Sequence, residues 1–121
     1  MADNSTQPDP FVDLSLQTSA GLSDAIRELG WIADGGDPSA SLDDRDLARL
    51  QKIEYERERI RVAQRLIAYL AKQLSVNPPS AQDLQQAKDI AAHLAQFVNV
   101  NVKATTVIQS ATDLLNIYAK A

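Results

Sequence analysis

The chain has 121 residues, a formal net charge of −4 and no cysteine. The lack of cysteine excludes disulfides, thiolate metal sites and cysteine nucleophiles. With two Phe, one Trp and three Tyr, the core must be filled mainly by Leu, Ile, Val and Ala, and the length fits one domain. No apolar run approaches roughly 20 residues, so we expect no membrane span.

Charge is divided unevenly along the chain. Residues 1–46 carry ten acidic and two basic side chains, whereas residues 47–121 carry six acidic and ten basic ones. An acidic front and a basic following segment can attract each other within one chain or between copies. Alternatively, the acidic and the basic segments are simply solvent-exposed faces of the protein.

The N-terminal end is polar and acidic. Residues 1–10 contain two prolines and predict a disordered tail, followed by a single helical domain over residues 11–121. They lack the basic start and apolar stretch of a signal peptide, so we expect a cytoplasmic protein or one packaged in a particle. Next, Val12, Leu14 and Leu16 alternate with polar residues and predict an extended lead-in.

Residues 20–33 predict a first, short and acidic helix. Apolar residues there recur at intervals of three and four, which is typical of one amphipathic face. Gly35-Gly36 then predicts the helix end, because glycine accepts the left-handed conformation that follows a helix.

Residues 42–76 predict a long second helix without Pro or Gly. Ser41, with Asp44 three residues later, resembles a capping box at its start. A seven-residue ladder of Ile53, Ile60, Ile67 and Leu74 places four apolar side chains on one stripe, the spacing of helix-to-helix packing. Glutamates and arginines at i,i+3 spacing in residues 54–61 support the helix from its own surface.

Residues 80–118 predict a third helix, which begins after a corner at Asn77, Pro78 and Pro79 with Ser80 as its N-cap. The sequence at 98–102 alternates Val and Asn, which is a strand signature. Two interpretations follow. Either one helix continues through 98–103, which we favour because the apolar ladder stays in phase, or the chain bends there and a fourth helix starts near Ala104.

Together these elements predict an all-α fold. We expect a three-helix bundle, or a four-helix bundle if the chain breaks at 98–103. The long antiparallel hairpin of 42–76 and 80–118 dominates it, and the helix at 20–33 closes one side.

Few residues suggest chemistry. His93 is the one histidine, and with Asp89 it provides two of the three or four ligands that zinc requires. The glycines form no phosphate-binding loop. We therefore expect no metal, no cofactor and no enzymatic activity.

Two features suggest binding. Arg57, Arg61 and Arg65 fall four residues apart and predict a basic ridge that can contact phosphates or an acidic protein surface. Trp31, beside the Gly-Gly stop, is interpreted as a lid on the core or as an exposed anchor for a partner.

Residues 70–84 resemble the helix-turn-helix of bacterial repressors. Ala71, Val76, Asn77, Pro78 and Ser80 match that motif, whereas Ser75 replaces its turn glycine and Asp83 lies on the face that reads DNA.

The sequence thus favours a non-enzymatic helical interaction or assembly protein, which binds a protein partner or a second copy. Its binding residues are expected to be Ile53, Ile60, Ile67, Leu74, Arg57, Arg61, Arg65 and Trp31. Bacterial adaptors, secretion chaperones and virion components are also built from such helices, and this comparison is an analogy. The alternative is a nucleic-acid-linked regulator that uses the basic ridge or the corner at 70–84.

Overall fold

The computed structural model describes residues 9–97 and 102–121, and in these residues it is entirely helical, without a strand. The helices are α1 (Pro10–Ala33), α2 (Leu42–Leu70), α3 (Ala81–Phe97) and α4 (Ala104–Tyr118). The all-α bundle is therefore confirmed. The prediction of a disordered tail falls mostly on residues 1–8, which lie outside the described residues. No helix of the described residues is long and apolar enough to cross a membrane.

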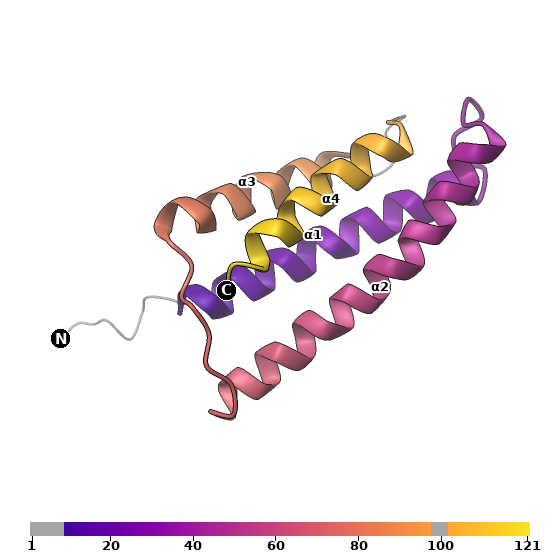
Figure 1. Cartoon of the computed structure of the whole chain (residues 1–121). Coiled ribbons are helices and arrows are strands. Elements are labelled where there is room, and N and C mark those ends of the chain that lie inside the picture. The colour runs from indigo at the N-terminus through magenta and orange to yellow at the C-terminus, as the bar shows by residue number, and fades with distance from the viewer. Residues whose placement is uncertain (1–8, 98–101) are drawn as a thin grey trace.

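Helix α1 is the centre of the bundle. It contacts α2, α3 and α4, with α2 on one side and the α3–α4 pair on the other (Figure 1). Side chains along its whole length are buried, so the expectation of a short helix closing one side is wrong. The buried positions are Phe11, Leu14, Ser15, Thr18, Gly21, Leu22, Ala25, Ile26, Glu28, Leu29, Ile32 and Ala33.

Helix α1 begins ten residues earlier than the sequence predicted, and the extended lead-in is wrong. The Asp9 carboxylate accepts hydrogen bonds from the backbone N–H groups of Phe11 (2.8 Å) and Val12 (3.3 Å), so Asp9 is the N-cap. Pro10 occupies the first helical position, where its missing N–H costs nothing. The buried face follows Phe11 and Leu14 at helical spacing, and Leu16 points to solvent.

The predicted stop after α1 is confirmed. Gly35 has φ of 85°, the left-handed conformation. The N–H of Gly36 donates to the carbonyl of Trp31 (2.8 Å), and that of Gly35 donates to Ile32 (3.1 Å). These two bonds form a Schellman motif, which satisfies the last carbonyls of the helix.

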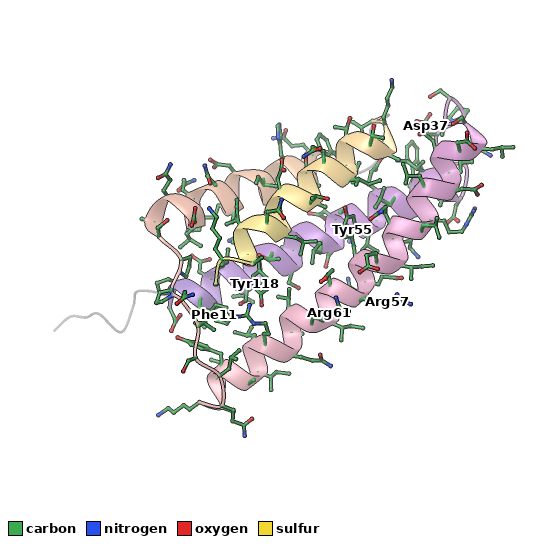
Figure 2. All side chains as sticks on the ribbon, viewed as in Figure 1. Phe11, Asp37, Tyr55, Arg57, Arg61 and Tyr118 are labelled. Carbon is green, nitrogen blue, oxygen red and sulfur yellow. The ribbon has the colours of Figure 1, made fainter. Side chains whose placement is uncertain are left out.

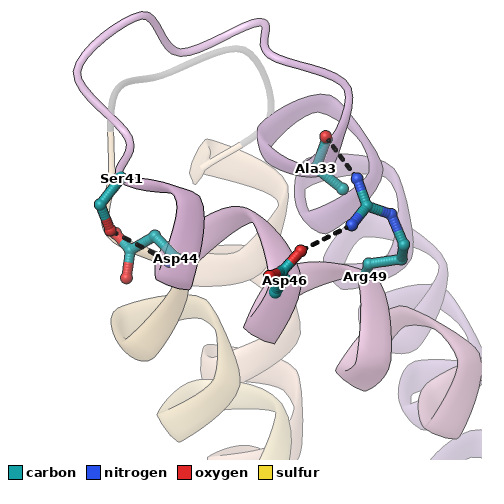
Figure 3. A network of polar contacts seen from close by, with 5 residues as sticks. All are labelled: Ala33, Ser41, Asp44, Asp46 and Arg49. Carbon is teal, nitrogen blue, oxygen red and sulfur yellow. Dashed lines mark hydrogen bonds and ion pairs between the residues drawn. The ribbon is translucent and has the colours of Figure 1, made fainter.

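Polar contacts fix the turn from α1 to α2 (Figure 3). Ser41 caps α2 as predicted, because its hydroxyl accepts from the N–H of Asp44 at 3.1 Å. Arg49 pairs with Asp46 (2.9 Å) and donates to the carbonyl of Ala33 (3.2 Å) at the end of α1. The start of α2 is thereby tied to the end of the central helix.

The long antiparallel pair has different partners from those expected. It consists of α1 and α2, because α2 and α3 make no contact among the described residues. Helix α2 ends at Leu70 rather than near residue 76, and residues 71–80 cross without helix to the far side of α1 (Figure 1). The corner at Pro78 and Pro79 belongs to this crossing segment. Ser80 caps α3 as predicted, through the N–H of Asp83 at 3.0 Å.

The favoured continuous third helix is wrong, and the alternative with a fourth helix at Ala104 is confirmed. Helix α3 ends at Phe97, and Val102 and Lys103 are not helical. Residues 98–101 lie outside the described residues. The ladder stays in phase because both helices present an apolar face to the core. These faces are Ala87, Ala91 and Leu94 on α3, and Ala104, Val107, Ala111 and Leu114 on α4.

Gly21 lets α3 and α4 approach α1 closely. A Cβ atom at Gly21 would lie 2.5 Å from Leu114 Cδ2 and 3.3 Å from Leu94 Cδ1. We therefore expect Gly21→Val to lower the free energy of unfolding by about 1–3 kcal/mol, the typical cost of overpacking. Urea denaturation measures this, with Ala20→Val on the exposed neighbour as the control. Equal losses in both variants would contradict the close packing.

Lys72 ends α2 in a conformation that suits glycine. Its φ is 61°, whereas the preceding Ala71 has φ of −82°. Lys72→Gly should raise the free energy of unfolding by roughly 0.5–1 kcal/mol, because the left-handed strain exceeds the extra chain entropy of glycine. Thermal unfolding measures this, and Ala71→Gly should destabilise. A stabilising Ala71→Gly with a destabilising Lys72→Gly would show that the helix ends elsewhere.

Candidate protein-binding surface

Helix α2 has two faces with different roles. Ala48, Tyr55 and Val62, spaced seven residues apart, are its buried residues. The Tyr55 hydroxyl donates to the carbonyl of Ile108 on α4 (3.2 Å) and lies 3.3 Å from the hydroxyl of Thr112. Burial of this hydroxyl raises the pKa of Tyr55. This face binds α2 to the rest of the bundle.

The other face of α2 exposes large apolar side chains, which we call the α2 stripe. At 100° per residue, Ile60 lies roughly 140° around the helix from the buried Tyr55. Six of the seven large hydrophobic side chains exposed among the described residues belong to this helix. The α2 stripe consists of Leu42 (75% exposed), Leu50 (66%), Ile53 (45%), Ile60 (56%), Ile67 (68%) and Leu70 (61%).

The predicted ladder and the α2 stripe overlap in part. The structure places Ile53, Ile60 and Ile67 on the stripe, but Leu74 is half-buried in the segment after α2. Sequence reasoning missed Leu42, Leu50 and Leu70. The signal was present for two of them, because Leu50 lies three residues before Ile53 and Leu70 three residues after Ile67.

The three arginines do not form one ridge. Arg57 and Arg61 extend from the exposed side of α2 (Figure 2) and pair with Glu54 (3.8 Å) and Glu58 (3.0 Å) of the same helix. Such surface pairs are worth little, about 0–1 kcal/mol each. Arg65 lies on the inner side, so the predicted phosphate-contacting ridge is divided.

Arg65 belongs to an aromatic cluster that joins α1, α2 and α4. Its guanidinium lies 5.3 Å from the ring centre of Phe11 and 5.2 Å from that of Tyr118, the distances of cation–π contacts. The Phe11 ring also contacts Tyr69, with ring centres 4.8 Å apart. Figure 2 shows Phe11 and Tyr118 at the end of the bundle where the chain enters α1.

A hydrogen bond connects this cluster to the cap of α1. The Tyr69 hydroxyl donates to the free oxygen of the Asp9 carboxylate at 2.6 Å. This bond, with the backbone N–H groups of Val12 and Phe11, lowers the pKa of Asp9, and the same bond raises the pKa of Tyr69. One carboxylate therefore caps α1 and holds the end of α2.

Trp31 lies near the end of α1. It is half-buried against the core, and the backbone of Gly36 packs so closely on its indole that no Cβ fits there. This position agrees with a lid on the core rather than with an exposed anchor.

The helix-turn-helix resemblance lacks the geometry of that motif. The motif needs two packed helices joined by a short turn. Residues 71–80 instead separate α2 from α3, and the two helices do not contact each other in the described residues. The shared residues therefore reflect similar capping and turn chemistry.

The remaining polar features are His93 and a hollow between α3 and α4. His93 is exposed, and its ring stacks on Phe97 with centres 5.6 Å apart. Within the described residues, no three metal-ligating side chains come together. An open hollow of about 410 Å³ between α3 and α4 is lined by Gln86, Asp89, Ile90, Asp113, Asn116 and Ile117.

Comparison with family models, with curated proteins and with solved structures finds no match to this chain.

The Asp9–Tyr69 bond makes stability depend on pH. A carboxyl whose pKa is lowered by folding stabilises the protein above its unfolded pKa, and this stabilisation is lost as the pH falls through the folded value. Tyr69→Phe should bring the pKa of Asp9 back toward 3.8, and an NMR titration of the Asp9 carboxyl measures this. Tyr55→Phe is the control and should leave that pKa unchanged. An unchanged value in Tyr69→Phe would contradict the contact.

Proposed function

We propose that this protein is a non-enzymatic helical interaction or assembly protein, and that the α2 stripe is its binding surface. The observation that carries the proposal is the exposure of Leu50, Ile53, Ile60, Ile67 and Leu70 along one helix. Isolated exposed hydrophobic residues are common, but a contiguous apolar patch on a folded protein is typical of a binding site.

The energetic argument uses ordinary magnitudes. Burying a Leu or Ile side chain completely is worth about 1.5–3 kcal/mol. The exposed parts of these five side chains amount to about three complete ones, or roughly 4–9 kcal/mol. Because association itself costs at least about 4 kcal/mol, the apolar surface of the partner must supply the rest of the binding energy. Leu42, Ile53, Ile60 and Ile67 lie within about 20° of one line along α2, and Leu50 and Leu70 flank this line on opposite sides. A second helix with its own apolar stripe is the partner that fits such a line of side chains.

The surface is also presented rigidly. The opposite face of α2 is held by Tyr55, Val62 and Ala48, and the start of α2 is held by Arg49. Ion pairs within the helix, such as Arg61 with Glu58, support its exposed middle. A partner therefore meets a formed helix, and little ordering entropy is lost on binding.

Site-specific photo-crosslinking tests the proposal. Ile60 on the α2 stripe is 56% exposed, and Leu16 on α1 is 57% exposed, so the two positions are matched in accessibility. A benzophenone amino acid at Ile60, expressed in the native host and irradiated, should give a discrete crosslinked product, while the same group at Leu16 should not. The product can be a second copy or another protein. No product at Ile60, or equal products at both positions, would contradict the proposal.

A further inference from the structure

We draw no further inference here: the strongest candidate, the exposed apolar face of α2 that carries Ile53, Ile60 and Ile67, supports nothing beyond the proposed function, because nothing in the described part of the chain shows what covers it.

Discussion

The structure depends on the burial of α1 between α2 and the α3–α4 pair. Burial along the whole of this helix, from Phe11 to Ala33, creates one core that every other helix shares. Such packing requires small residues where backbones approach, and Gly21 supplies this at the contact with Leu94 and Leu114. It also requires fixed ends, which the Asp9 cap and the Gly35 stop provide. The exposure of the α2 stripe follows from this central position of α1.

With α1 in the centre of the bundle, only one face of α2 packs against other helices. The chain leaves α2 at Leu70 and crosses to the far side of α1, so α3 and α4 do not pack on α2's outer face. Among the described residues, no element covers that face, yet it carries Ile53, Ile60 and Ile67. A helix that served only the monomer would be expected to have polar residues there. The side chains of the apolar stripe therefore lie outside the core of the bundle.

Much of the fold follows from local signals in the sequence. Contacts between segments that are distant in the sequence could not be predicted from it. The caps at Ser41 and Ser80 and the stop at Gly35 depend on a few neighbouring residues and were predicted correctly. The start of α1 differs from the prediction because the alternation of apolar residues at 12–16 conceals the helical face, although Asp9 and Pro10 are typical of a helix start. The pairing of α1 with α2 was missed because periodicity shows which face is apolar but not which helix covers it. For the same reason, the stripe at Ile53, Ile60 and Ile67 was visible, whereas the inward orientation of Arg65 was not.

The isoleucine methyl groups offer the most direct test of this account. Ile26 and Ile32 are buried on α1, while Ile53, Ile60 and Ile67 are exposed on α2. In methyl NMR spectra of a dilute sample with a soluble paramagnetic agent, the account predicts strong broadening of the three α2 signals and protection of the two α1 signals. Protected α2 methyl groups in a dilute monomer, or broadened Ile26 and Ile32, would contradict a bundle built around α1 with an apolar outer face on α2.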